Sequence, residues 1–276
     1  MHPILLNITT PSGVLPVYSY GAMIAIGFLA SYLYVCRLAI QRGIDGDHIT
    51  DLFIVIIAAS IVGARGNYVV THWQEYVRHT SSIPKVWEGG MVFLGGFIGA
   101  MVGGFVYLRA RGLPLGPYYD MFAPAVPFAC ALGRIGCFLN GCCYGVVCSL
   151  PWGMTFPSRD GLPSVPRHPT QLYELGVLVA MTGVLHRFYR TNRRPGMAMV
   201  ALAYLYSSER FLIEFIRDES TYEHYVFGLT LGQSTCLITF VCAAVCHAWI
   251  ATRCRPTWSP DEILAREAAS QSSSNS

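Results

Sequence analysis

The chain has 276 residues, of which 53% are hydrophobic and only 13% are charged, and its formal net charge is +3 at pH 7. A soluble domain carries roughly 25% charged residues, so this composition excludes an ordinary soluble globular protein and predicts a polytopic membrane protein. The small net charge says little by itself, because the positions of the charges matter more than their sum. No nucleic-acid partner is expected.

Seven apolar segments, each near the roughly 20 residues needed to cross a bilayer, follow one another along the chain. They lie at 17–35, 49–70, 91–108, 118–139, 171–188, 196–215 and 229–250. The first has no basic leader and no cleavage site of small residues, so we expect a retained helix rather than a signal peptide. The fourth contains Pro124 and Pro127, which predict a kink or a break.

This pattern predicts an all-α protein with about seven transmembrane helices. Residues 1–258 are expected to form one transmembrane domain. Residues 259–276 are polar and rich in serine, and we expect them to form a disordered cytoplasmic tail.

Basic residues are unevenly divided between the two ends of these segments. Eleven follow the odd-numbered segments or lie in the tail, namely Arg37, Arg42, Arg109, Arg111, Arg187, Arg190, Arg193, Arg194, Arg253, Arg255 and Arg266. Five lie at the opposite ends, namely Arg78, Lys85, Arg159, Arg167 and Arg217. Because basic residues favour the cytoplasmic side, we expect the amino terminus outside and the carboxyl terminus inside.

Three arginines remain within the apolar segments, Arg65, Arg134 and Arg210. Each falls in the second half of a segment that would run outward, so all three are expected near the depth of the outer headgroups. Charges inside a membrane are rarely without function. Because guanidinium groups bind phosphate through paired hydrogen bonds, the three arginines predict a site for a lipid phosphate. The alternative is that they extend to the outer interface and form local ion pairs.

The sixth segment carries a polar stripe. Tyr206, Arg210, Glu214 and Arg217 recur at spacings of four, four and three, so they are expected to share one helical face. Glu214 either neutralises Arg210 structurally or has a catalytic role, and the spacing does not decide between the two.

The fifth segment opens with a second polar motif at its outer end. Pro169 suits the first turn of a helix. The free backbone N–H groups there, flanked by Arg167 and His168, would form an anion site. His168 either stabilises the helix start or acts on the bound phosphate.

Ten cysteines are present, and Cys137, Cys142, Cys143 and Cys148 lie close together in the sequence after the fourth segment. On an oxidising outer face, a disulfide among Cys142, Cys143 and Cys148 is the favoured interpretation. A redox-active or acyl-carrying thiol is an alternative. A metal site is less favoured, because no histidine accompanies these cysteines at ligand spacing. We therefore expect no metal and no cofactor.

In this order, the motifs resemble those of the prolipoprotein diacylglyceryl transferases. The resemblance covers most of the chain and is carried by Tyr20-Gly21, Gly63-Ala64-Arg65, Trp87-Glu88-Gly89-Gly90-Met91, Gly133-Arg134, Asn140-Gly141, the Arg-His-Pro run at 167–174 and the run at 210–217.

The resemblance implies a multi-pass enzyme of the bacterial inner membrane that acts at the outer leaflet. It would move the diacylglyceryl group of phosphatidylglycerol onto the lipobox cysteine of a prolipoprotein signal peptide, with loss of glycerol phosphate. The catalytic residues would be Arg134, Arg210, Tyr206, His168 and Glu214. Substrate would be bound by Arg134, Arg210, Arg65, Tyr20, Asn140, Gly141, Arg167 and Arg217.

The chain departs from the family pattern at three positions. Leu94 stands where the family usually has a histidine proposed as a base, and Cys137 and Cys142 stand where it usually has asparagine and glutamate. The acceptor thiol would therefore need another route to the thiolate. We favour the electrostatic field of the arginines, and the alternative is proton transfer to His168 or Glu214.

Other functions stay open beside this one. The first is a paralogous transferase with the same donor and a different acceptor, and the second is a non-catalytic lipid-binding protein. An anion or lipid transporter would place charges along a path through both leaflets. The inner halves of the segments carry only Asp120 at their inner edge, which argues against transport.

Overall fold

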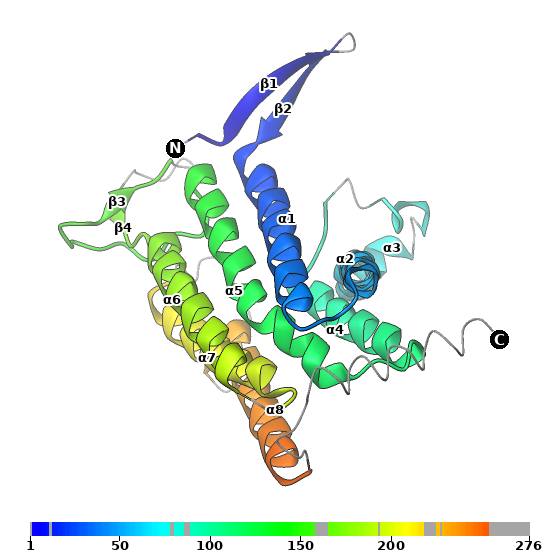
Figure 1. Cartoon of the computed structure of the whole chain (residues 1–276). Helices are drawn as coiled ribbons and strands as arrows, with labels where there is room; N and C mark the ends of the chain where they lie inside the picture. Colours follow the sequence, from blue (N-terminus) through cyan, green and yellow to red (C-terminus); the bar gives the residue numbers. More distant parts are fainter. Residues whose placement is uncertain are drawn as a thin grey trace. The chain divides into compact units, whose positions relative to one another are not determined.

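The computed structural model describes residues 2–10, 13–77, 80–85, 89–157, 165–192, 194–217, 225–226 and 228–253 (Figure 1). Its helices are α1 (Ser19–Ile40), α2 (Gly46–Thr71), α3 (Trp73–Tyr76), α4 (Phe93–Ala110), α5 (Leu115–Asn140), α6 (Thr170–Thr191), α7 (Met197–Ile213) and α8 (Leu231–Arg253). Two 3-10 turns, η1 (Thr80–Ser82) and η3 (Glu214–Ile216), extend this set. Three short antiparallel pairs join β1 (Ile4–Thr10) to β2 (Gly13–Tyr18), β3 (Met154–Thr155) to β4 (Pro166–Arg167) and β5 (Tyr225–Val226) to β6 (Leu229–Thr230).

Each of the seven predicted apolar segments corresponds to a long helix in the described part of the chain. Among these helices, α1, α2, α5 and α8 are long and apolar enough to cross a membrane, and α4 is a shorter apolar helix. The all-α membrane class is therefore confirmed. The helices α6 and α7 carry charged residues that lower their apolar character. The count of seven spans and the orientation stay predictions.

The prolines of the fourth segment do not break it, since α5 continues through both Pro124 and Pro127. The β1–β2 hairpin was not predicted, and the first apolar segment was started within β2 rather than at Ser19, where α1 begins. The predicted disordered tail, 259–276, lies outside the described residues.

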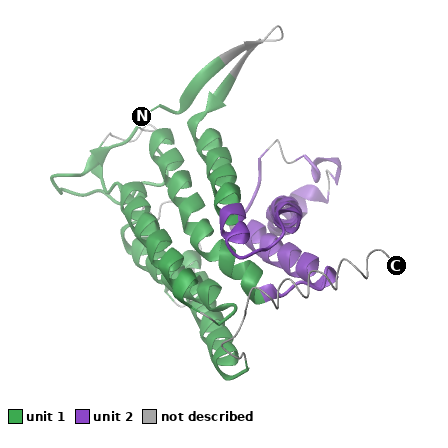
Figure 2. Ribbon diagram, in the orientation of Figure 1, with its two compact units in different colours: residues 1–35, 116–257 green, residues 36–115, 258–276 purple. Residues whose placement is uncertain are grey.

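The chain divides into two compact units (Figure 2). Unit 1 comprises residues 1–35 and 116–257, and unit 2 comprises residues 36–115 with 258–276. Unit 1 contains most of α1 and α5, together with α6, α7 and α8, and unit 2 contains α2, α3 and α4.

In unit 1, Asp120 fixes the start of α7. Its carboxylate accepts hydrogen bonds from the backbone N–H groups of Gly196 at 2.7 Å, Ala198 at 2.9 Å and Met199 at 3.1 Å. These N–H groups have no partner within the helix, and the helix dipole also favours a negative charge at this end. Asp120 is 2% exposed, so this buried carboxylate attaches α7 to α5 at the end where α7 begins.

In unit 2, α2 and α4 are in backbone contact along a line of small residues. A Cβ added to Gly99 would overlap the carbonyl of Ala59 and lie 3.1 Å from the Cα of Gly63. Gly63 and Gly95 approach one another in the same way. Small residues at such positions let helices in a membrane pack closely, so unit 2 is held by van der Waals contact between backbones.

This packing predicts that Gly99→Ala destabilises the protein. We expect a loss of about 1–3 kcal/mol, the usual effect of overfilling a packed interface. The measurement is thermal unfolding of the purified chain in detergent.

Gly66→Ala in α2 is the matched control, because nothing lies within 4 Å of a Cβ added there. That change should be neutral or stabilising by about 0.5–1 kcal/mol. Equal unfolding temperatures for the two variants would contradict the glycine-mediated packing of α2 on α4.

Candidate functional site

The candidate site lies at the end of unit 1 where α5 and α7 finish and α6 begins. Arg134, on α5, forms an ion pair through Nη2 with Oε2 of Glu174, on the second turn of α6. The Arg134 side chain is 16% exposed and that of Glu174 only 2%. Glu174 was not among the predicted site residues. A buried arginine needs a carboxylate partner, and this requirement could have identified Glu174 from the sequence.

Arg210 forms a second ion pair close to the end of α7. Its Nη2 lies 2.6 Å from Oε2 of Glu214, and the hydroxyl of Thr230 donates to the other carboxylate oxygen at 3.2 Å. A Cβ added to Gly232 would lie 2.7 Å from that same oxygen. Glu214 is therefore enclosed as the counterion of Arg210, which matches the structural alternative for this residue.

Arg217 does not share the helical face of Tyr206 and Arg210, so that prediction is wrong. The helix α7 ends at Ile213, and a 3-10 turn carries the chain through Ile216. Arg217 then has an extended backbone with φ −80° and ψ 146°. The change from α-helix to 3-10 turn removes the spacing on which the predicted face depended.

Tyr206 and Glu209 are two partly buried polar residues of α7. Both lie within electrostatic range of Arg134 and Arg210. Glu209 had no place in the predicted site.

Several atoms here are buried without a hydrogen-bond partner among the described residues, namely Oε1 of Glu174, Oε1 of Glu209 and Nη1 of Arg210. Leaving such an atom unsatisfied costs about 1–3 kcal/mol, so these atoms mark a place where a polar ligand would be stabilised.

The segment 145–147 pairs through its backbone with two other segments of unit 1. The N–H of Gly145 donates to the carbonyl of His168 at 2.9 Å, and the N–H of His168 donates to the carbonyl of Val146 at 3.1 Å. The N–H of Val146 donates to the carbonyl of Ile216 at 3.0 Å. Further bridges pair Gly145 with Arg217 and Val147 with Arg167. The segment 145–147 thus lies between the segment that carries Arg167 and His168 and the segment that carries Arg217.

The segment 145–147 requires glycine at position 145. An added Cβ would overlap the carbonyl of Ile216 and would lie 2.8 Å from His168 Cβ and from Thr170 Cγ2. A larger residue would push apart the two segments that carry His168 and Arg217.

The side chain of His168 contacts Tyr173, with 3.4 Å between Nδ1 and the hydroxyl oxygen. The indole N–H of Trp152 donates to the same hydroxyl at 2.8 Å. The N-cap residue of α6 is Pro169, and no side-chain cap bond is present there. His168 therefore belongs to a polar contact with the first turns of α6. Beside it, the guanidinium of Arg167 lies 5.0 Å from the ring centre of Tyr144.

Three further predicted residues lie around the end of α5. A Cβ added to Gly136 would lie 3.3 Å from Cα of Tyr20, so α1 contacts α5 there. The Tyr20 phenol lies within electrostatic range of Arg134. Asn140 is the last residue of α5, and Gly141 follows it with φ +67°.

Arg65, the remaining predicted residue, belongs to unit 2. Its guanidinium donates to four backbone carbonyls, those of Ile83 at 2.8 Å, Gly89 at 2.7 Å, Gly90 at 3.2 Å and Ser82 at 2.6 Å. A guanidinium has five N–H groups, so four of its bonds serve the segment between α2 and α4. Its predicted contact with a phosphate stays a prediction.

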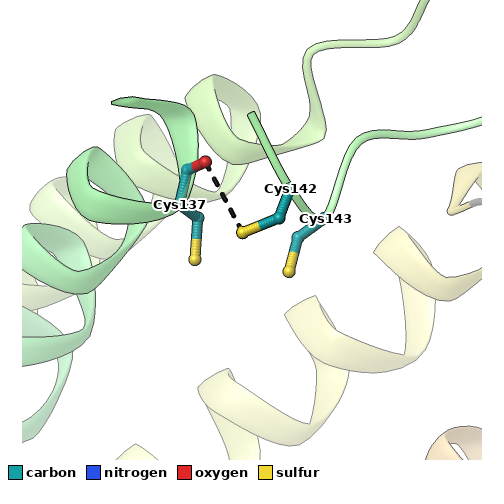
Figure 3. Close-up of side chains that lie close together, drawn as sticks. All are labelled: Cys137, Cys142 and Cys143. Carbon is teal, nitrogen blue, oxygen red and sulfur yellow. Dashed lines mark hydrogen bonds between the residues drawn. The ribbon is translucent and has the colours of Figure 1, made fainter. Parts of the chain in front are cut away.

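The favoured disulfide does not form in the described part of the chain, where no disulfide bond includes Cys142, Cys143 or Cys148. A different set of three is brought together, comprising Cys137, Cys142 and Cys143, whose Sγ atoms all lie within 4.8 Å of one another (Figure 3).

Comparison with known proteins adds an independent finding. The family model described as "Prolipoprotein diacylglyceryl transferase" matches residues 3–249. A phosphatidylglycerol–prolipoprotein diacylglyceryl transferase of Geobacter sulfurreducens is 36% identical over 221 residues, which is 78% of this chain and 83% of the relative. A protein of the same name from Cupriavidus metallidurans is 34% identical over 258 residues, covering 90% of this chain and 94% of the relative. One from Azotobacter vinelandii is 36% identical over 244 residues, covering 86% and 91%.

The geometry of the first ion pair predicts that Glu174→Gln destabilises the protein strongly. The change would leave the Arg134 charge buried without its counterion, which typically costs about 3–5 kcal/mol. Thermal unfolding in detergent measures the effect.

Asp51→Asn provides the control, because it breaks an exposed pair with Arg111 whose two side chains are each 50% exposed. Such pairs contribute at most about 1 kcal/mol. If Glu174→Gln proved as mild as Asp51→Asn, Glu174 would not be the counterion of a buried charge.

Proposed function

The chain belongs to the prolipoprotein diacylglyceryl transferase family, and we propose that it transfers the diacylglyceryl group of phosphatidylglycerol to a cysteine thiol of a prolipoprotein. The acceptor is the lipobox cysteine at the end of a signal peptide, and the leaving group is glycerol phosphate. The observation that carries the proposal is the buried N–H of Arg210 that has no partner among the described residues, beside the Arg134–Glu174 pair.

The two arginines can hold a phosphate without losing their carboxylates. Arg134 and Arg210 each contact a glutamate through Nη2. Each guanidinium has further N–H groups for phosphate oxygens. The glutamates fix the direction of the donors, so little ordering is needed when the lipid binds.

The reaction develops negative charge where these donors are. The thiolate sulfur attacks the glyceryl carbon that carries the phosphate, and the carbon–oxygen bond breaks. The departing glycerol phosphate keeps the electron pair and gains a negative charge. Donors already oriented toward that charge stabilise the transition state more than they stabilise the reactants, which is the usual source of such catalysis.

The contacts of the proposed catalytic residues indicate different roles for them. Glu214 is 2% exposed and both its oxygens are engaged by Arg210 and Thr230, which favours a positioning role. Tyr206 interacts electrostatically with both Arg134 and Arg210, and it would contact the phosphate. Arg167, His168 and Arg217 lie on the two segments that pair with residues 145–147, and these residues would contact the headgroup.

For the membrane arrangement, we propose seven spans in a bacterial inner membrane, with the amino terminus outside. Under this orientation the ends of α5 and α7 and the start of α6 open to the outer leaflet. The excess of basic residues at the opposite helix ends supports it.

The test of this function is transfer by the purified full chain in vesicles that contain phosphatidylglycerol labelled in its diacylglyceryl group. The acceptor is a prolipoprotein peptide with one cysteine. Arg210→Lys should lower the rate by about 10²–10³-fold, the range seen when one oriented donor to a developing anion is lost. Arg253→Lys, at the exposed end of α8, is the matched control and should keep the wild-type rate.

Two results would count against the proposal. Unchanged transfer by Arg210→Lys at equal protein abundance would remove Arg210 from phosphate binding. Release of glycerol phosphate without labelling of the peptide would favour the paralogous transferase with another acceptor.

The orientation has its own prediction. A membrane-impermeant reagent should reach a tag placed at Ser158 in intact spheroplasts, and a tag placed after Ser259 only after lysis. The opposite pattern of labelling would place the site at the inner leaflet and contradict the proposed topology.

A further inference from the structure

Cys137, Cys142 and Cys143 form a cysteine cluster at the end of α5 (Figure 3). Their Sγ atoms all lie within 4.8 Å of one another, and among the described residues no histidine or carboxylate joins the group. Cys137 is buried, whereas Cys142 and Cys143 are partly exposed. The cluster therefore offers three soft ligand atoms, two of them on partly exposed residues.

The backbone is held so that the three sulfurs meet. Gly141 and Cys143 have φ +67° and +63°, and Cys143 is the one described residue other than glycine with a positive φ. Such a conformation is unfavourable for a side-chain-bearing residue and persists only where the surroundings enforce it.

Two fully buried residues at the start of α6 supply that enforcement. Gln171 donates to the carbonyl of Cys142 and Thr170 to that of Cys143, each at 2.7 Å. These two hydrogen bonds fix the turn that follows α5, and this turn places the sulfurs of Cys142 and Cys143 close to the sulfur of Cys137.

Polar groups lie beside the sulfurs, and the thiol of Cys142 donates to the carbonyl of Cys137 at 3.7 Å. The side-chain amide of Asn140 donates to Sγ of Cys142 at 3.4 Å. The guanidinium of Arg134 lies within electrostatic range of the sulfurs of Cys137 and Cys143. Metals bind the thiolate form of cysteine, so the three thiols would lose their protons when the ion binds.

We propose that the cysteine cluster binds a zinc ion whose fourth coordination position takes the acceptor thiol. Thiolates select zinc among the common metals, together with copper(I). Zinc with three protein ligands keeps a position open for substrate. Zinc–sulfur bonds of about 2.3 Å in a tetrahedron would place sulfurs about 3.8 Å apart. The present sulfurs would thus close in by about 1 Å or less through side-chain rotation.

The zinc ion answers the question of how the acceptor is activated, and this inference rests on the proposed function. A thiol bound to zinc loses its proton to water. The bound thiolate then attacks the glyceryl carbon, a carbon–sulfur bond forms, and the carbon–oxygen bond to phosphate breaks. Glycerol phosphate leaves with the electron pair beside Arg134. The thioether product carries no charge on sulfur and is a weaker ligand, so it leaves the metal.

The first measurement is zinc binding by the purified full chain, reduced, stripped with a chelator and reloaded with Zn²⁺. We expect about one zinc ion per chain, determined by elemental mass spectrometry. Cys142→Ser and Cys143→Ser each remove a zinc ligand. Loss of an outer hydrogen-bond partner alone lowers metal affinity by about 10–100-fold, so each of these variants should lower zinc affinity by more than that. Cys148→Ser, outside the cluster, should bind zinc as the wild type does.

The second measurement uses Co²⁺ in place of zinc as a spectroscopic probe. Binding should produce a sulfur-to-cobalt charge-transfer band, and a peptide with one cysteine should change the cobalt spectrum. The same peptide with serine in place of cysteine should leave it unchanged.

Several outcomes would overturn the inference. These are a reduced wild-type chain that binds no zinc, a Cys143→Ser variant that binds zinc normally, or a disulfide within the cluster that consumes two thiols. Copper(I) bound by the three sulfurs with no response to the peptide would do the same.

The inference and the proposed function fail separately. Diacylglyceryl transfer that continues unchanged in the zinc-free chain would remove the metal and keep the function. Zinc binding with a response to the peptide, but without transfer, would keep the metal site and remove the function.

Discussion

A guanidinium buried among packed helices must be neutralised close by, and this requirement organises unit 1. The counterion of Arg134, on α5, is Glu174 on α6. The counterion of Arg210, near the end of α7, is Glu214, four residues further along the chain. Removing either partner would leave an uncompensated charge, so the charged residues and the positions of the three helix ends depend on one another. A site that needs buried cations can be kept inside the protein only because the structure supplies carboxylates beside them.

The other end of the same helices is fixed by one carboxylate. Asp120 on α5 accepts three backbone N–H groups at the start of α7. The helices α5 and α7 are thus attached at one end by Asp120, and both contribute an arginine at the other. This arrangement leaves the arginine end free to carry unsatisfied polar atoms, such as Nη1 of Arg210, without loss of the bundle.

Apolar run lengths were enough to predict all seven long helices, because each run is bounded by turn residues or charges. The alternation of helix directions also brought Arg134 and Arg210 to one end. The partner of Arg134 was not predicted, since Glu174 was interpreted only as part of the run that opens α6. Spacing alone placed Arg217 on α7, and it could not reveal that the α-helix stops at Ile213. The meeting of Cys137 with Cys143 depends on a left-handed residue, which has no sequence signal outside glycine and asparagine.

The central claim is that Arg210 binds the lipid phosphate rather than serving only Glu214. The direct measurement is the amount of phosphatidylglycerol that the purified chain retains, determined by native mass spectrometry over a series of lipid concentrations. Loss of charge-assisted bonds worth about 1.5–3 kcal/mol should weaken retention by Arg210→Gln about 10–100-fold, while Arg253→Gln retains the lipid as the wild type does. Equal retention by Arg210→Gln and the wild type would contradict the account.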